Sequence, residues 1–221
     1  GVERMMVNLA RGLSSLGAEV DFIVKHTQAP YLDKLPPAVR LIEFGLGEEA
    51  ESVEKLLHYL EQNLPAALIS AKRKADTVAM RARRKTTAPT RFFLRPGSSI
   101  SERLRARNAN LLKRWFTKRS MRWLYGEADG VIAVSECIAE DVIQIAGIDP
   151  ARVHVVRNPN ITPELYELAA APVDHPWFAA GQPPILLGIG GLRKAKDFPT
   201  LLRAFARVNR KRPSRLMILG K

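Results

Sequence analysis

Residues 185–221 read ILLGIGGLRKAKDFPTLLRAFARVNRKRPSRLMILGK, and this stretch decides the fold. It opens with an apolar run that ends in glycines, as expected of a buried parallel strand entering a tight turn. Apolar residues then recur at helical spacing over 198–208, with Asp197 as the expected side-chain cap and Pro199 in the first turn. Residues 216–219 supply a second apolar strand. The stretch therefore predicts a β-α-β unit whose first turn lies where ligands bind in open α/β sheets.

The same alternation of strand and helix occurs upstream. Periodicity and turn residues predict helices at 2–16, 53–64, 76–85, 102–125 and 136–147, and strands at 20–24, 39–44, 67–70, 91–95, 130–134 and 153–156. Residues 159–184 hold six prolines and little periodicity, which predicts a linker. The pattern indicates an α/β protein with two Rossmann-like domains, at 1–158 and 185–221, that face each other across a cleft.

Both ends of the sequence interrupt this alternation. The helix at 2–16 has no strand before it, and the strand at 216–219 has nothing after it. A single β-α-β unit leaves much of its sheet uncovered. We therefore expect a fragment that lacks the first strand and most of the second domain.

The composition favours anionic partners. Among 221 residues, 35 Lys+Arg oppose 22 Asp+Glu, a net charge of +13 that suits nucleotide phosphates, nucleic acid or an anionic membrane surface. Cys137 is the single cysteine, which excludes an internal disulfide and suits a reducing compartment. No apolar run approaches the roughly 20 residues of a membrane-spanning helix. We expect a cytoplasmic protein, either free or peripheral on the inner face of the membrane.

The turn at 188–196 has the composition of a phosphate site. Gly188, Gly190 and Gly191 allow main-chain N–H groups to approach a ligand, and Lys196 adds a positive charge beside the helix N-terminus. An ordinary strand-to-helix turn with a solvated lysine is the alternative. A dinucleotide fingerprint is disfavoured, because G-x-G-x-x-G requires glycine where Arg193 stands.

Three segments resemble one enzyme family. GIGGLRKAKDFPTLLRAFARV, from 188 onward, resembles the start of the donor domain of family 4 retaining glycosyltransferases, which have the GT-B fold. Residues 1–4 and the helix behind them resemble the family's amino-terminal G-G-x-E segment. ADGVIAVSECIAEDVIQIAGIDPARVHVVRNPN, at 128–160, resembles the last part of the acceptor domain.

The resemblance implies an activity. A sugar would pass from a nucleotide-diphospho-sugar to a glycan or lipid-linked acceptor with retention, in cell-surface polysaccharide synthesis, without a metal or other cofactor. The family's paired glutamates, spaced E-x7-E, would lie beyond Lys221, so no catalytic residue is assigned here and the fragment itself is expected to be inactive.

The resemblance also implies a donor site. The diphosphate would lie on Gly190, Gly191 and Lys196. The family usually carries an arginine where this chain has Gly191, and Arg193 or Lys194 would have to take its place.

Three further residues are expected to line the cleft. These are Gly1, Glu3 and Arg95. The alternative for Glu3 is a first-turn acid that interacts with the helix dipole, and the alternative for Arg95 is an ordinary surface charge.

The sequence gives little support for a metal site or for a reactive cysteine. The four histidines have no ligand spacing and no D-x-D pair occurs, so no metal site is predicted. Cys137, near a helix start, is expected to be a small buried residue rather than a nucleophile.

The basic, tryptophan-containing segment 104–125 has two interpretations. It could rest on an anionic bilayer, or it could bury an apolar face in the core and expose a basic one. A nucleic-acid-binding module is the alternative for the whole chain, although no recognised motif is present. Another GT-B enzyme, such as an epimerase or a phosphorylase, is the alternative within the fold.

Overall fold

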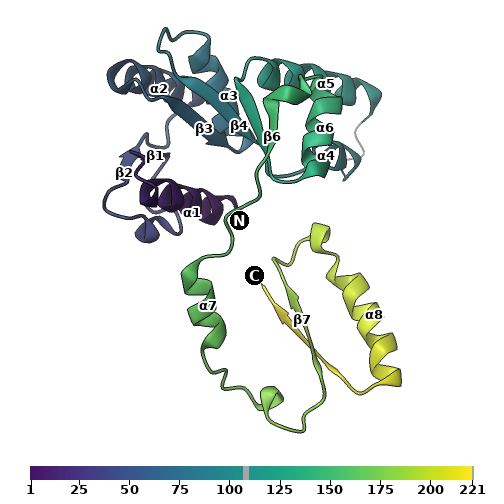
Figure 1. The fold of residues 1–221 in the computed structure, drawn as a ribbon. Helices are drawn as coiled ribbons and strands as arrows, with labels where there is room; N and C mark the ends of the chain where they lie inside the picture. The colour runs from purple at the N-terminus through teal and green to yellow at the C-terminus, as the bar shows by residue number, and fades with distance from the viewer. Residues whose placement is uncertain (107–109, 221) are drawn as a thin grey trace. The chain divides into compact units, whose positions relative to one another are not determined.

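The computed structural model describes residues 1–106 and 110–220. The chain divides into two compact units, Gly1–Thr162 and Pro163–Lys221, each treated by itself below. Figure 1 shows the strands of each unit with their helices.

Unit 1 alternates strands with helices, as the sequence predicts. Its strands are β1 (Asp21–Val24), β2 (Arg40–Glu43), β3 (Ala67–Ala71), β4 (Arg91–Arg95), β5 (Gly130–Ala133) and β6 (Val153–Val155). Its helices are α1 (Val2–Ser15), α2 (Glu49–Asn63), α3 (Arg73–Arg83), α4 (Ile100–Ala106), α5 (Leu111–Gly126) and α6 (Glu136–Ala146). Short 3-10 turns occupy Leu32–Lys34 and Pro150–Arg152.

Every strand pair in unit 1 is parallel. One sheet has the order β3-β4-β5-β6, and β1 pairs with β2 in a separate sheet. The register sets Ala71 opposite Arg95, so the carboxyl ends of β3 and β4 meet at one edge. Helix α3 contacts β3 and β4, and α6 contacts β5 and β6.

The core of unit 1 lies between this sheet and its helices. Its most deeply buried side chains are Phe92, Leu60, Met80, Leu94, Leu124, Val131 and Val142. They come from β4, β5 and from helices α2, α3, α5 and α6, so burial of apolar area holds these elements together.

Helix α6 shows the predicted local signals at both ends. The Ser135 hydroxyl accepts the N–H of Ile138 at 3.4 Å, as an N-cap does. Gly147 follows with a φ of 65°, the left-handed conformation in which glycine ends helices.

Several helix boundaries differ from the predictions, and α2, for example, begins at Glu49 and not at 53. The single helix predicted over 102–125 is described as α4 and α5, on either side of residues 107–109, which lie outside the described residues. The basic helix predicted at 76–85 begins earlier, at Arg73. Its first turn is polar and basic, so apolar periodicity gives no signal there.

Unit 2 contains α7 (Pro163–Ala170), the strands β7 (Ile185–Ile189) and β8 (Arg215–Leu219), and α8 (Phe198–Lys211). Short 3-10 turns lie at Pro176–Phe178 and Lys194–Lys196. The predicted β-α-β unit is confirmed, with β7 and β8 parallel. The linker predicted over 159–184 omits α7. Leu165 and Leu168 on this helix are exposed, so it lacks the buried face that produces a periodic pattern.

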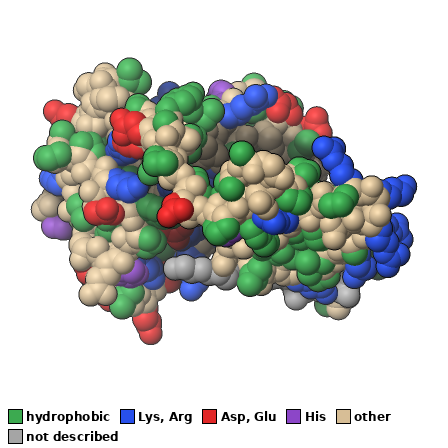
Figure 2. Space-filling view, turned by 90° about the horizontal axis from the view of Figure 1, so that it is seen from below, with side chains coloured by type: hydrophobic (Ala, Val, Ile, Leu, Met, Phe, Trp, Pro, Cys, Tyr) green, Lys and Arg blue, Asp and Glu red, His purple; other side chains and the backbone are tan. Residues whose placement is uncertain are grey.

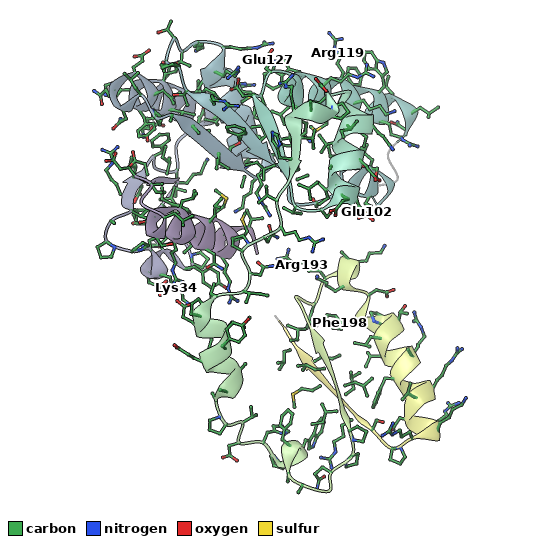
Figure 3. All side chains as sticks on the ribbon, viewed as in Figure 1. Lys34, Glu102, Arg119, Glu127, Arg193 and Phe198 are labelled. Atoms are coloured by element: carbon green, nitrogen blue, oxygen red, sulfur yellow. The ribbon has the colours of Figure 1, made fainter. Side chains whose placement is uncertain are left out.

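Gly188 brings α8 close to β7. A Cβ on Gly188 would lie 3.0 Å from Leu201 Cδ2 and 3.3 Å from Phe198 Cε1. Figure 3 shows Phe198 between the helix and the strands. The missing side chain therefore lets the apolar face of α8 rest on the strand that precedes the glycine turn.

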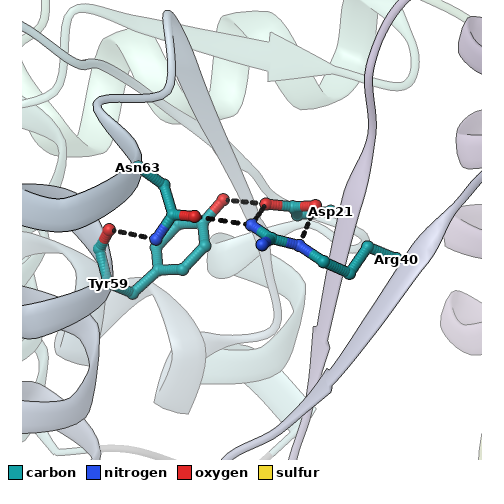
Figure 4. Close-up of polar contacts among 4 residues, drawn as sticks. All are labelled: Asp21, Arg40, Tyr59 and Asn63. Atoms are coloured by element: carbon teal, nitrogen blue, oxygen red, sulfur yellow. Dashed lines mark hydrogen bonds and ion pairs between the residues drawn. The ribbon is translucent and has the colours of Figure 1, made fainter.

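A polar cluster ties α2 to the sheet of β1 and β2 (Figure 4). Arg40 Nε donates to Asp21 Oδ1 at 2.8 Å across the two strands, and Tyr59 Oη donates to Asp21 Oδ2 at 2.6 Å. Asn63 completes the cluster by accepting from Arg40 Nη2 at 2.7 Å. The Arg40 hydrogen bond, and then that of Tyr59, hold the pKa of Asp21 below its usual value. Burial, followed by the Asp21 hydrogen bond, raises the pKa of Tyr59 to about 12.

We predict that Tyr59→Phe lowers the free energy of unfolding by about 1 kcal/mol near neutral pH, because a hydrogen bond to a carboxylate is lost. Because the folded pKa of Asp21 is depressed, its contribution is present above its unfolded value of about 4 and is lost as pH falls through the folded pKa. Urea unfolding at neutral and acidic pH measures both effects. The control is Tyr166→Phe, at an exposed tyrosine of α7. A loss of equal size at both pH values would contradict the assignment.

Candidate functional site

The turn after β7 is held by main-chain hydrogen bonds. Gly190 donates its N–H to the Leu219 carbonyl at 2.9 Å, which ties the turn to the end of β8. The N–H of Arg193 donates to Gly191 O at 2.7 Å, and that of Lys196 to Arg193 O at 2.9 Å. The turn thus folds back on itself between the strand and the start of α8.

Gly190 and Lys196 are brought together in this turn. Gly190 has a φ of 157°, which side-chain-bearing residues rarely adopt, and a Cβ there would lie 3.4 Å from Lys196 Cδ and Cε. The alkyl part of Lys196 therefore lies over Gly190. Arg193 is exposed, as is Lys196, whereas Gly191 is half-buried.

The predicted side-chain cap of α8 is wrong. Asp197 occupies the N-cap position, but its backbone is left-handed, with a φ of 46°, and its carboxylate makes no capping hydrogen bond. Pro199 lies in the first turn as predicted. The positive end of α8 is therefore left without a side-chain acceptor, beside Lys196.

We predict that Gly190→Ala destabilises the β7–β8 pair by about 1 kcal/mol, because an alanine backbone is strained at this φ. Amide hydrogen exchange in β7 and β8 measures the effect. Gly12→Ala, in α1 with no atom within 4 Å of the added Cβ, serves as the control and should be neutral or stabilising. Unchanged protection in Gly190→Ala would show that the turn tolerates a side chain.

Arg95 lies at the carboxyl end of β4 and is only 4% exposed. This excludes the alternative of an ordinary surface charge. Its Nη2 donates to Asn158 Oδ1. A Cβ on Gly97 would lie 3.3 Å from Arg95 Nη1 and 3.7 Å from Val2 Cγ2, so Arg95 and the start of α1 flank the same glycine.

Glu3, in the first turn of α1, forms an ion pair with Lys72. The Lys72 hydrogen bond lowers the pKa of Glu3. Lys72 follows β3 directly and has a φ of 84°. Gly1 is the N-cap residue of α1 and is exposed. In unit 1 the predicted residues Gly1, Glu3 and Arg95 thus lie around the start of α1 and the carboxyl ends of β3 and β4.

Sequence reasoning missed two residues of this edge. Asn158, in the segment that follows β6, accepts a hydrogen bond from Arg95 through its side-chain oxygen. Asn8 of α1 donates to the Pro159 carbonyl at 2.8 Å, next to Asn158. An asparagine on a helix face does not by itself predict such a contact, because its partner lies 151 residues away in sequence. Together these contacts fasten the end of unit 1 to α1 and β4.

The basic segment follows neither interpretation along its whole length. Met121, Leu124 and Tyr125 of α5 are buried in the core. Its first two turns instead expose four apolar side chains by 56% to 83%: Leu111, Leu112, Trp115 and Phe116. Figure 3 shows Arg119 extending outward from α5. The space-filling view in Figure 2 shows hydrophobic side chains scattered among lysines and arginines.

The described part of the chain contains no cluster of metal ligands and no helix suited to span a membrane. There, no group of three or more His, Cys, Asp or Glu side chains could hold a metal ion. Cys137 is exposed, contrary to the expectation of a buried residue. No described helix combines the length and hydropathy needed to cross a bilayer.

The comparisons with known proteins identify a family and a fold. A family model described as "Glycosyl transferase 4-like domain" matches residues 1–159. No curated protein matches the sequence.

Solved structures also match. The chain resembles a glycosyltransferase from Rickettsia africae ESF-5 with a TM-score of 0.65, at 17% identity, over 100% of this chain and 57% of that one. It resembles the apo form of the lipopolysaccharide outer core galactosyltransferase WaaB with a TM-score of 0.59, at 17% identity, over 97% of this chain and 56% of that one. A UDP-N-acetylglucosamine 2-epimerase from Rickettsia bellii follows, with a TM-score of 0.50 at 13% identity, over 97% of this chain and 58% of that one.

These likenesses confirm the predicted α/β fold of the GT-B class. The chain spans little more than half the length of the solved structures that it matches.

Proposed function

The chain belongs to the glycosyl transferase 4-like family, and from this premise we propose that it is the acceptor-side domain and the start of the donor domain of a glycosyltransferase. The donor is a nucleotide-diphospho-sugar, and the acceptor is a glycan or a lipid-linked sugar of cell-surface polysaccharide synthesis. Transfer proceeds with retention at the anomeric carbon.

The observation that carries the donor proposal is the contact of Lys196 with Gly190. The Lys196 stem lies against a glycine that holds the turn open, and the adjacent N-terminus of α8 lacks a side-chain cap. A diphosphate bound there would meet a helix N-terminus and a lysine ammonium. Arg193, exposed in the same turn, takes the place of the arginine that the family usually carries at the position of Gly191.

Positive charge at this corner has a chemical role. Breaking the bond between the sugar and the diphosphate leaves negative charge on the diphosphate. Donors placed in advance around that group stabilise the charge as it develops. No metal ion is needed in this proposal, because lysine, arginine and the helix N-terminus supply the positive charge.

We predict that UDP or GDP shifts the amide resonances of Gly190, Gly191 and Phe198 in the 221-residue chain. Lys196→Ala should weaken the apparent affinity about tenfold, since a hydrogen bond to a charged group contributes about 1.5–3 kcal/mol. Lys211→Ala, at the far end of α8, is the matched control. Saturable binding that is equal in both variants would remove Lys196 from the site. Absence of shifts with either nucleotide would count against the turn as a donor site.

We also propose that the first two turns of α5 rest on an anionic membrane surface, where a lipid-linked acceptor would be found. Exposed Leu111, Leu112, Trp115 and Phe116 supply the apolar contact. The helix contains five lysines and arginines and no acidic residue, which complements anionic headgroups.

We predict that the chain co-sediments with phosphatidylglycerol vesicles and not with phosphatidylcholine vesicles, and that high salt releases it. Arg114→Glu with Arg119→Glu should weaken binding by about tenfold or more, since each basic residue contributes about 1 kcal/mol near such a surface. Arg203→Glu with Arg207→Glu on α8 changes the net charge equally and should keep most of the binding. Equal losses in both pairs would mean that overall charge, not α5, drives the association. Tighter binding to duplex DNA than to vesicles would favour the nucleic-acid-binding alternative.

A further inference from the structure

Helix α7 (Pro163–Ala170) lies exposed at the start of unit 2. None of its residues is buried, and Leu165 and Leu168 are 39% and 69% exposed. A helix shorter than about 12–15 residues is marginal in water by itself, because most helical stability in proteins comes from packing of an apolar face. An eight-residue helix with exposed leucines therefore requires a surface to pack against.

The surroundings of α7 are acidic and apolar. Residues 161–174, here called the α7 segment, contain no lysine or arginine, in a chain that has 35 of them. Glu167 and Asp174 are exposed, and neither forms an ion pair with a described residue. Ile161 and Val173, on either side of the helix, are 71% and 66% exposed. A partner that covers this segment must therefore be apolar and basic.

The first two turns of α5 have these complementary properties. Four apolar side chains are 56% to 83% exposed there: Leu111, Leu112, Trp115 and Phe116. Arg114, Lys118 and Arg119 are exposed beside them, and none of the three forms an ion pair with a described residue. Helix α5 contains no acidic residue. An acidic, apolar helix can thus pack here and pair the charges that it covers.

The two surfaces also agree in shape and length. A hollow of about 780 Å³ opens along α5, lined among others by Trp115, Phe116 and Arg119. Helix α7 has eight residues and is about 12 Å long, whereas two turns of α5 span about 11 Å. A helix that projects from another molecule can enter such a hollow along its whole length.

We propose that the first two turns of α5 bind the α7 segment of a second copy of this chain. A copy of the chain is the partner because each chain carries both halves of the contact, the basic apolar surface and the acidic apolar helix. When each copy receives the α7 segment of the other, the contact closes around a two-fold axis and gives a dimer.

The contact has a consequence for regulation, which rests on the proposed membrane function of α5. The α7 segment of the second copy covers the apolar side chains that would enter the bilayer. Dimer formation and binding to an anionic membrane therefore exclude each other, and only a chain released from its partner presents α5 to lipid.

Sedimentation equilibrium of the 221-residue chain tests the contact in the absence of lipid. The wild type should be a dimer of 24.6 kDa chains. Arg114→Glu with Arg119→Glu should be monomeric, although it lowers the net charge and with it the general repulsion between copies. Glu167→Lys with Asp174→Lys should also be monomeric. An equimolar mixture of these two variants should restore the dimer, because the charges of the two surfaces are then exchanged.

Two further variants separate the contact from general effects of charge. Arg203→Glu with Arg207→Glu on α8 changes the net charge as the α5 pair does and should leave the dimer intact. Leu168→Ser changes no charge and should weaken the dimer about tenfold, because a buried leucine is lost. A wild-type chain that stays monomeric would overturn the proposal, as would two monomeric charge variants whose mixture does not associate.

Binding to phosphatidylglycerol vesicles tests the regulation. Added vesicles should dissociate the wild-type dimer. Leu168→Ser should bind vesicles more tightly than the wild type, because less of its α5 is covered, whereas Leu202→Ser, at an exposed leucine of α8, should bind as the wild type does. Equal vesicle affinity of Leu168→Ser and the wild type would overturn the mutual exclusion. Absence of vesicle binding in every variant would instead contradict the membrane function of α5, and the mass measurements without lipid would still decide the dimer.

Discussion

Parallel pairing of β3 with β4 is the constraint on which the acceptor-side unit depends. It sets Ala71 opposite Arg95 and brings both carboxyl ends to one edge, where Lys72, Arg95 and the start of α1 meet. The apolar side chains of β4, Phe92 and Leu94, are sealed in the core beneath that edge. Burial of these side chains fixes the position of β4, and the register fixes β3 beside it. The positions of the charged residues at the ends of both strands are therefore also fixed.

Charge pairing distinguishes Arg95 from Arg40 and Arg83, two other described arginines of unit 1. The Asp21–Arg40–Tyr59–Asn63 cluster satisfies its members within the protein and fastens α2 to the first two strands. Arg83 and Asp129 do the same between α3 and the start of β5. Arg95 has only a neutral partner. The distinction is physical, because a paired guanidinium has its charge compensated and an unpaired one favours an anion.

The donor-side unit is packed differently, because none of the residues of α8 is buried against its two strands. In this unit the helix is held by close approach to the strand and not by deep burial of its side chains. Gly188 admits Leu201 and Phe198 against the strand, and Gly190 admits the stem of Lys196. Both glycines thus have a role in packing that does not depend on a ligand. In this turn Lys196 lies over Gly190, and the N-terminus of α8 has no side-chain cap. The shape of the turn therefore places two positively polarised groups where they favour a negative charge.

The sequence by itself determined the alternation of strands and helices, the β-α-β unit at 185–221 and both ends of α6, because apolar periodicity, glycines and caps are local signals. It missed α7, because this helix has no buried apolar face. It placed Asp197 correctly at the N-cap position of α8, but it did not predict the left-handed backbone of that residue. Only the tertiary structure decided that Arg95 is buried beside Asn158, that Lys72 pairs with Glu3, and that the first two turns of α5 are exposed. These outcomes depend on partners as far as 69 residues apart in the Glu3–Lys72 pair. Packing of distant segments sets burial and pairing, and no local pattern encodes it.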